Sequence, residues 1–147
     1  ERYLMTKDEI TEEIVTLLAG RAAEELIFKT VTTGAANDIE RATELARAMV
    51  TRLGMSDEFD MMALEKESNR YLNGNTVMTC SDNTGSRADA EILNIIKSCH
   101  KKAVDVLKEN TEALHRIAEF LIEKETISGE EFMEILNQTD KRNNNID

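Results

Sequence analysis

Apolar residues recur three and four positions apart over most of the chain, which is the spacing of one face of an α-helix. This pattern predicts five helices, at about residues 7–27, 36–53, 87–109, 112–124 and 129–136. The chain has no proline, four Phe and two Tyr, and this composition also favours helix. We therefore predict an all-α, five-helix, bundle-like domain over residues 1–136, followed by a polar, disordered tail at 137–147.

Several residues mark the expected ends of these helices. Thr6, with Glu9 three residues later, forms the capping-box pattern of a helix start. Gly54 is a favoured residue just past a helix C-terminus. Either Asn110 or Thr111 is expected to cap the fourth helix.

Residues 55–85 show no sustained helical period. Asn73-Gly74 lies between residues 70–72 and 76–78, and an Asn-Gly pair is typical of a two-residue hairpin turn. The surrounding Asn, Ser, Asp and Gly residues agree equally well with a loop. A small hairpin and a long irregular loop therefore both remain open at this stage.

Asp38 is an acid near the buried side of the second predicted helix. Its spacing from Ala42, Leu45 and Met49 places it at the edge of the apolar face. A carboxylate there needs a cation, N–H donors or a metal ion as its partner. One interpretation is structural, because the helix dipole and the free N–H groups of a first turn stabilise acids. The alternative is a functional site.

The first predicted helix becomes charged in its last two turns. Its apolar stripe consists of Ile10, Ile14, Leu17 and Leu18. The same spacing then leads to Arg21, Glu24 and Glu25. These charges agree with a buried polar site between the first two helices, since charged residues are rarely buried without partners. They also agree with a stripe that rotates, because a second row stays apolar and consists of Val15, Leu18, Ala22 and Leu26.

The charge of the chain limits its partners. The net charge is −11, from 29 acidic and 18 basic residues, and the basic residues are dispersed. Phosphate binding needs clustered Lys and Arg, so we expect no nucleic-acid partner. The chain has no Gly-rich phosphate loop, and we do not expect it to bind ATP by itself. No apolar run approaches the roughly 20 residues that span a bilayer.

The cysteines and histidines do not form an obvious site. Cys99 is expected in the core and Cys80 in a polar loop, both reduced in an intracellular protein. His100 is expected to face the core as a structural residue, and His115 to lie at the surface. The zinc-protease signature H-E-x-x-H is absent from these 147 residues.

Two stretches of the chain together resemble a known protein family. Residues 18–28 read LAGRAAEELIF, and residues 32–43 read TTGAANDIERAT. They resemble the helix before the metal-ligand loop, and the third-ligand motif, of FtsH-type proteases. The similarity continues at residues 48–51, 54–57, 2–7 and 124–127, and covers nearly all of residues 2–136. The FtsH-type proteases are membrane-anchored, ATP-dependent AAA+ zinc metalloproteases.

The resemblance implies roles for both unusual acids. Asp38 matches the acid that completes a His, His, Asp zinc site, and Glu24 matches the acid that supports a ligand histidine. It further implies an ATP-binding AAA+ module in the parent protein, a hexameric assembly, and unfolded or membrane proteins as substrates in protein quality control. The parent would work in the cytoplasm, on the cytoplasmic face of a membrane.

The chain also departs from the family pattern. The two His ligands and the general-base Glu of the family come from an upstream H-E-x-x-H helix. We therefore expect a later part of a peptidase domain, inactive alone and with its zinc site vacant. The alternative is a truncated, catalytically inactive relative that acts as a structural or protein-interaction module. Residues 59–86 differ from the commoner family members, and we assign them no function.

Overall fold

The computed structural model describes residues 4–67, 76–124 and 129–144. Within these ranges the elements are α1 (Lys7–Phe28), the 3-10 turn η1 (Thr33–Ala35), α2 (Ala36–Thr51), β1 (Glu65–Glu67), β2 (Thr76–Met78), α3 (Asp82–Glu109), α4 (Thr111–Lys124) and α5 (Gly129–Asn144). The predicted all-α class is confirmed, because the described residues contain five α-helices and one sheet of two three-residue strands.

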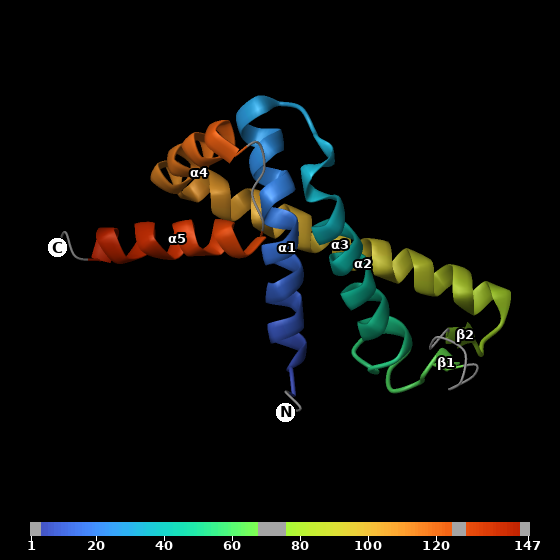
Figure 1. Ribbon diagram of the computed structural model, residues 1–147. Coiled ribbons are helices and arrows are strands. Elements are labelled where there is room, and N and C mark those ends of the chain that lie inside the picture. The colour runs from blue at the N-terminus through green and yellow to red at the C-terminus, as the bar shows by residue number, and fades with distance from the viewer. Residues whose placement is uncertain (1–3, 68–75, 125–128, 145–147) are drawn as a thin grey trace.

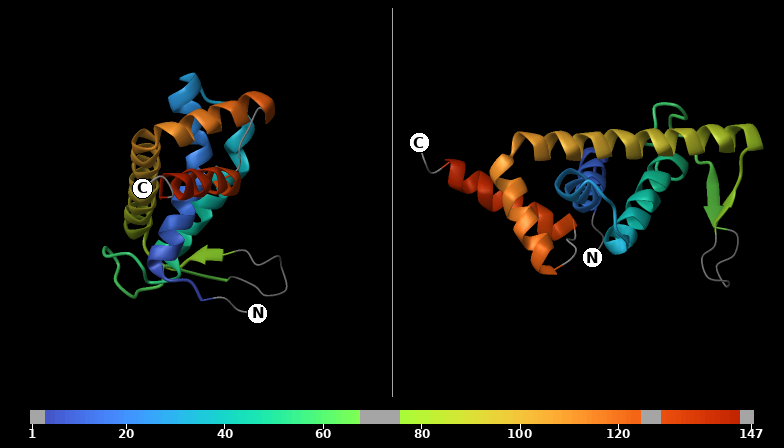
Figure 2. Two further views of the ribbon diagram at one scale, coloured as in Figure 1. Left: turned by 90° about the vertical axis from the view of Figure 1, so that its left-hand side faces the viewer. Right: turned by 90° about the horizontal axis from the view of Figure 1, so that it is seen from above.

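α1 lies at the centre of the molecule (Figure 1) and packs against the other four α-helices. α3 is the longest helix and runs along one edge, with the other helices to one side of it when the molecule is seen from above (Figure 2). A helix with neighbours on several sides is apolar around much of its circumference. This is why α1 has two apolar rows, and why residues 17–20 and 22–24 are all buried.

The core has two parts that meet along α1. The first lies between the N-terminal half of α1, α2 and α3, and includes Ile10, Ile14, Leu17, Met49, Val50 and Ile92. The second lies between the C-terminal half of α1, the end of α3, α4 and α5, and includes Ala19, Ala22, Ala23, Leu107, Ile117 and Phe132. Small side chains on the second half of α1 let the neighbouring helices approach it closely.

The predicted start of α1 and the end region of α2 are confirmed. The Thr6 hydroxyl accepts a hydrogen bond from the Glu9 backbone N–H at 3.1 Å. α2 ends at Thr51, two residues before the predicted limit. Gly54 follows with a φ of +62°, and a Cβ there would lie 3.1 Å from the Cα of Met61. Glycine is therefore favoured at this position both by conformation and by space.

Two helix boundaries were predicted wrongly. α3 starts at Asp82, five residues before the predicted start, and Ser81 caps it by accepting from the Thr84 N–H at 3.2 Å. α5 continues to Asn144, so residues 137–144, which we had placed in a disordered tail, are helical. Within this extension Thr139 is buried, with only 1% of its surface exposed.

The choice of cap between α3 and α4 is partly resolved. The Asn110 side chain donates to the Val106 carbonyl at 2.8 Å, so this amide closes the end of α3. The Asn110 carbonyl accepts from the Leu114 N–H at 3.0 Å and begins α4.

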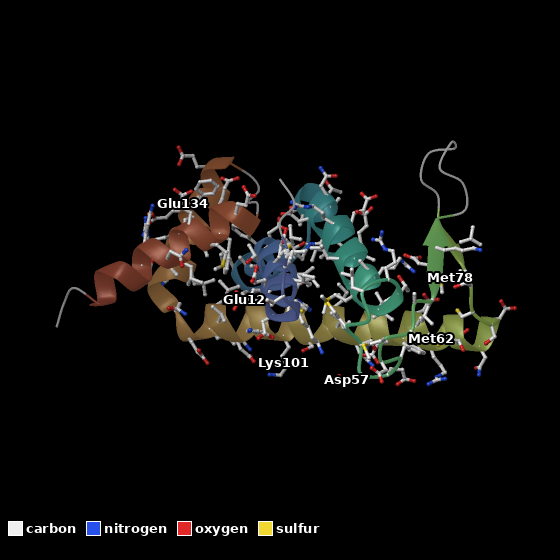
Figure 3. The ribbon with its side chains drawn as sticks, turned by 90° about the horizontal axis from the view of Figure 1, so that it is seen from below. Glu12, Asp57, Met62, Met78, Lys101 and Glu134 are labelled. Atoms are coloured by element: carbon white, nitrogen blue, oxygen red, sulfur yellow. The ribbon has the colours of Figure 1, made fainter. Side chains whose placement is uncertain are left out.

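The hairpin alternative is confirmed, but with a different partner strand. β2 is the predicted segment 76–78, yet it pairs with β1, with Glu65 opposite Met78 and Glu67 opposite Thr76. The expected partner, residues 70–72, and the Asn73-Gly74 pair lie outside the described residues. Leu64, just before β1, is fully buried; its N–H donates to the Thr51 carbonyl at 2.7 Å, and its carbonyl accepts from the Thr79 N–H at 2.8 Å. Met62 and Met78 remain exposed at this end of the molecule (Figure 3).

None of the helices, over the part of the chain that the structure describes, has the length and apolar character needed to cross a membrane.

Candidate metal centre

Asp38 is the third residue of α2 and lies in its first turn. Its side chain is partly exposed, and it borders a groove of about 620 Å³ between α1, α2 and the start of α5. The remaining lining residues of the groove are Met5, Glu9, Glu12, Glu13, Thr16, Leu17, Arg41 and Glu130. Asp38 therefore lies at the edge of the buried face, as the spacing predicted.

The groove carries more negative than positive charge. Its acids are Glu9, Glu12, Glu13, Asp38 and Glu130, and its single base among the described residues is Arg41. Arg41 forms an ion pair with Glu13, with its Nη2 3.0 Å from the Glu13 Oε1. A cleft lined by charges of one sign concentrates ions of the opposite sign. The electrostatics around Asp38 thus favour a cation.

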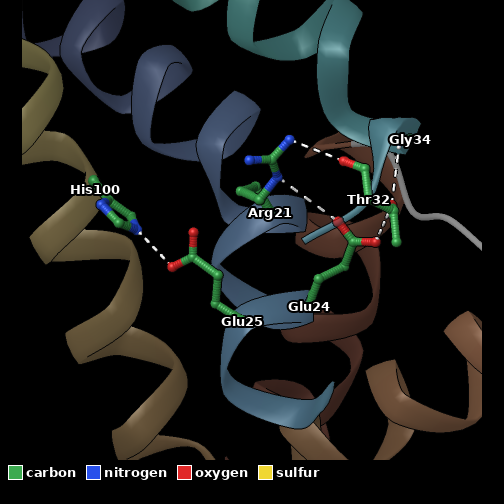
Figure 4. A network of polar contacts seen from close by, with 6 residues as sticks. All are labelled: Arg21, Glu24, Glu25, Thr32, Gly34 and His100. Carbon is green, nitrogen blue, oxygen red and sulfur yellow. Dashed lines mark hydrogen bonds and ion pairs between the residues drawn. The ribbon is translucent and has the colours of Figure 1, made fainter. Parts of the chain in front are cut away.

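Glu24 is the buried acid of α1, with 4% of its surface exposed. Its Oε1 accepts a hydrogen bond from the Thr32 hydroxyl at 2.5 Å. Its Oε2 lies 3.9 Å from the Arg21 Nε, and both atoms are buried without a hydrogen-bond partner (Figure 4). A buried carboxylate oxygen in this state is costly unless an N–H or O–H donor reaches it.

Arg21 and Thr32 tie the end of α1 to the turn that precedes α2. The Arg21 Nη2 donates to the Thr32 carbonyl at 2.9 Å. The Gly34 N–H donates to the Thr32 hydroxyl at 3.2 Å, which begins η1. These contacts span 11 residues of sequence and join the two motifs that carry the family resemblance.

The expected burial of charge near the end of α1 is confirmed for Glu24, whereas the Arg21 side chain is 25% exposed. The alternative, a rotating stripe that leaves every charge in water, is wrong for Glu24. Asp38 and Glu24 do not line the same groove. Glu24 lies seven residues beyond Leu17, which is about 10 Å further along α1.

Glu25 and His100 were placed less well by the sequence. The His100 side chain is 43% exposed instead of core-facing, and its Nε2 lies 3.2 Å from the Glu25 Oε2. His115 is exposed, as predicted. Cys99 is buried as predicted, and burial raises the pKa of its thiol, with a smaller opposing effect from the Lys102 charge.

The described residues do not form a metal site by themselves. No group of three or more His, Cys, Asp or Glu side chains in these ranges is arranged to hold a metal ion. Asp38 fits one ligand position, because its carboxylate borders an open acidic groove. Glu24 fits a supporting position, because its Oε2 lacks a donor. The donor set is therefore compatible with zinc, provided that further ligands come from outside these residues.

Thr32 is the residue of this site that sequence reasoning passed over. It lies within the matched motif, but its spacing gave no reason to pair it with Glu24 across the turn. The one available signal was local, because Thr before a Gly-containing turn is typical of a side chain that caps the following backbone.

Comparison with known proteins shows that one family matches the part of the chain that contains all of these residues. The model of Peptidase family M41 matches residues 1–135. The ATP-dependent zinc metalloprotease FtsH of Clostridium perfringens is 54% identical over 136 residues, which cover 92% of this chain and 19% of that protein. The protein of the same name from Lancefieldella parvula is also 54% identical over 136 residues, which are 92% of this chain and 21% of that protein. The one from Thermotoga maritima is 41% identical over 141 residues, covering 94% and 23% respectively. The chain thus spans about a fifth of the length of these relatives.

Proposed function

The chain belongs to Peptidase family M41, and from this premise we propose that it forms the C-terminal part of the peptidase domain of an ATP-dependent zinc metalloendopeptidase. The observation that carries the proposal is the match over residues 1–135, which includes both acids and the turn between them. The geometry supports it, because Asp38 borders an open acidic groove and Glu24 keeps one oxygen without a donor.

In this proposal Asp38 is the third zinc ligand, and Glu24 accepts a hydrogen bond from the N–H of a ligand histidine. Zinc, when bound, lowers the pKa of a coordinated water and polarises the peptide carbonyl. Asp38 would supply its carboxylate as a ligand from the first turn of α2. Glu24 holds the imidazole in one tautomer and one orientation, which is the usual role of a carboxylate beside a metal-bound histidine.

Other parts of the activity are proposed to come from elsewhere in a longer protein. The two His ligands and the general-base Glu are assigned to an H-E-x-x-H helix that precedes this chain in sequence. ATP binding is assigned to an AAA+ module, and the assembly is proposed to be a hexamer. Its substrates are proposed to be unfolded or membrane proteins on the cytoplasmic face of a membrane.

The isolated chain is proposed to be inactive and to bind zinc weakly, because one or two carboxylates do not make a tight zinc site. Calorimetric titration of the 147-residue chain with zinc measures this directly. Stoichiometric binding at micromolar affinity or better would contradict the division of ligands proposed above.

The ligand assignment is tested in the full-length protease with Asp38→Ala. Proteolysis of an unfolded substrate is expected to be lost while ATP hydrolysis persists. Glu40→Ala is the matched control, since Glu40 is an exposed acid on the same turn of α2. Retained proteolysis in Asp38→Ala, at the level of the control, would refute the assignment.

A further inference from the structure

Thr32 links the two acids of the site. We propose that Thr32 is a positioning residue, which both leaves one Glu24 oxygen available to a ligand histidine and fixes the turn that carries Asp38. This inference rests on the proposed zinc site and names a residue that acts on it indirectly.

The Thr32 hydroxyl both donates and accepts a hydrogen bond, and these two bonds define its orientation. A hydroxyl has one proton to donate and lone pairs to accept with. The proton points to the Glu24 Oε1 at 2.5 Å, and the oxygen accepts from the Gly34 N–H at 3.2 Å (Figure 4). The bond to Gly34 orients the hydroxyl, and the oriented hydroxyl in turn orients the carboxylate.

The two oxygens of the Glu24 carboxylate therefore have different surroundings. Oε1 accepts from Thr32, whereas Oε2 is buried without a hydrogen bond and has only the ion pair with the Arg21 Nε at 3.9 Å. What Oε2 lacks is a donor, and an imidazole N–H is a donor of the required kind. Without the Thr32 hydroxyl, Glu24 is free to rotate toward Arg21 and to turn this oxygen away.

The Thr32 backbone joins the end of α1 to the turn that precedes α2. Its carbonyl accepts from the Arg21 Nη2 at 2.9 Å, so α1 holds the turn through both the side chain and the main chain of one residue. η1 follows at once, and Asp38 is only six residues beyond Thr32. The N-cap residue of α2, Ala35, makes no side-chain cap hydrogen bond, and the preceding turn η1 contacts both α1 and α2.

The test compares Thr32→Val, which removes the hydroxyl at constant shape, with Thr32→Ser, which keeps it. Thr43→Val is the matched control, because the Thr43 hydroxyl donates only within α2, to the Ile39 carbonyl at 2.9 Å. Thr32 is exposed, so neither substitution at this position disrupts the core. Zinc affinity of the full-length protease is measured by competition with a chelator, together with ATP hydrolysis.

Thr32→Val is expected to weaken zinc binding about tenfold or more, the lower end of the range for groups that support metal ligands. Thr32→Ser is expected to restore it, while Thr43→Val and ATP hydrolysis stay at the native level. In the 147-residue chain, amide hydrogen exchange supplies a readout without zinc. The Gly34 amide is expected to lose protection in Thr32→Val and to keep it in Thr32→Ser.

The outcomes distinguish the positioning role of Thr32 from the proposal that Asp38 is a zinc ligand. If Asp38→Ala lowers zinc affinity while Thr32→Val keeps it, the positioning role of Thr32 is wrong. If Asp38→Ala itself keeps zinc, the ligand assignment fails and the positioning role falls with it, whatever Gly34 exchange shows. Equal losses in Thr32→Val and Thr32→Ser would also overturn the inference, because the hydroxyl would then not be the group responsible.

Discussion

The His100 Nε2 of α3 lies 3.2 Å from the Glu25 Oε2 of α1, whereas the adjacent Glu24 points away toward Thr32 (Figure 4). Two consecutive acids of one helix thus have different surroundings. The Glu25 side chain is 37% exposed, and the Glu24 side chain is 5% exposed. The Glu25 contact bridges two helices at the surface, and the Glu24 contact holds an internal turn.

Replacing these two acids is expected to have unequal effects on stability. Glu24→Ala removes the hydrogen bond that the buried Glu24 carboxylate accepts from the Thr32 hydroxyl, and a hydrogen bond to a charged group is worth about 1.5–3 kcal/mol. Glu25→Ala removes an exposed ion pair, which is worth less than about 1 kcal/mol. Urea denaturation of the 147-residue chain measures both values, and each variant serves as the other's control. Equal losses would contradict the contrast in burial.

Sequence spacing predicted that charge accumulates near the end of α1, but it did not distinguish Glu24 from Glu25. Both lie at the margin of the apolar stripe, and which one is buried depends on where η1 and α3 pack. That information is tertiary and is absent from the period of α1. The same limit applies to Thr32, whose partner lies across a turn. It also applies to His100, which was predicted in the core because it follows an apolar helix face but is partly exposed.

The spacing of apolar residues predicted the helices correctly where it repeats over several turns. It failed at the start of α3, where residues 82–86 are polar or Gly, and at the end of α5, where residues 137–144 are all polar. The hairpin shows a third limit, since the sequence pattern did not identify residues 65–67 as the strand that pairs with β2.

Cys80 and Cys99 are expected to react very differently with a thiol reagent. Burial raises the pKa of Cys99, so its reactive thiolate is scarce near neutral pH, and its exposed surface is only 3%. At pH 7 one thiol per chain, that of Cys80, is expected to react quickly. Cys99 is expected to react only when the chain opens. Reaction of both thiols at one rate in the folded chain would contradict this.

The raised pKa of Cys99 also predicts a pH dependence of stability. The folded chain favours the neutral thiol, so this contribution is complete below the pKa of an unfolded thiol, about 8.5, and is lost as pH rises through the folded value. The free energy of unfolding is therefore expected to fall between neutral and strongly alkaline pH. Cys99→Ala should reduce the size of that fall, and an identical fall in the variant would assign it to other groups.

Enlarging the small residues of α1 is expected to destabilise the fold. Ala22 is fully buried, in the core part that α1 shares with α3, α4 and α5. Ala22→Leu overfills this contact and is expected to cost about 1–3 kcal/mol or more. Ala90→Leu is the control, because Ala90 is exposed on α3 and its replacement should stay within about 0.5 kcal/mol. Thermal denaturation measures both, and a neutral Ala22→Leu would contradict the close packing.

The last turns of α5 provide a test of a helix held by polar contacts. Thr139 is 1% exposed, its hydroxyl donates to the Ile135 carbonyl at 3.1 Å, and the Arg116 Nη1 lies 3.4 Å from it. The Arg116 Nη2 also donates to the Gln138 Oε1 at 3.0 Å, so α4 contacts two successive residues of α5.

Thr139→Lys is therefore expected to destabilise the chain by about 2–3 kcal/mol, because it places an amine in a buried position beside the Arg116 guanidinium. Asn137→Lys is the control. Asn137 is exposed on the same helix, and its replacement by Lys adds the same positive charge. Urea denaturation followed by circular dichroism measures both the stability and the loss of helix. If the two lysine variants unfold at the same urea concentration, residues 137–144 do not pack on the domain, and the helix there is held by local propensity alone.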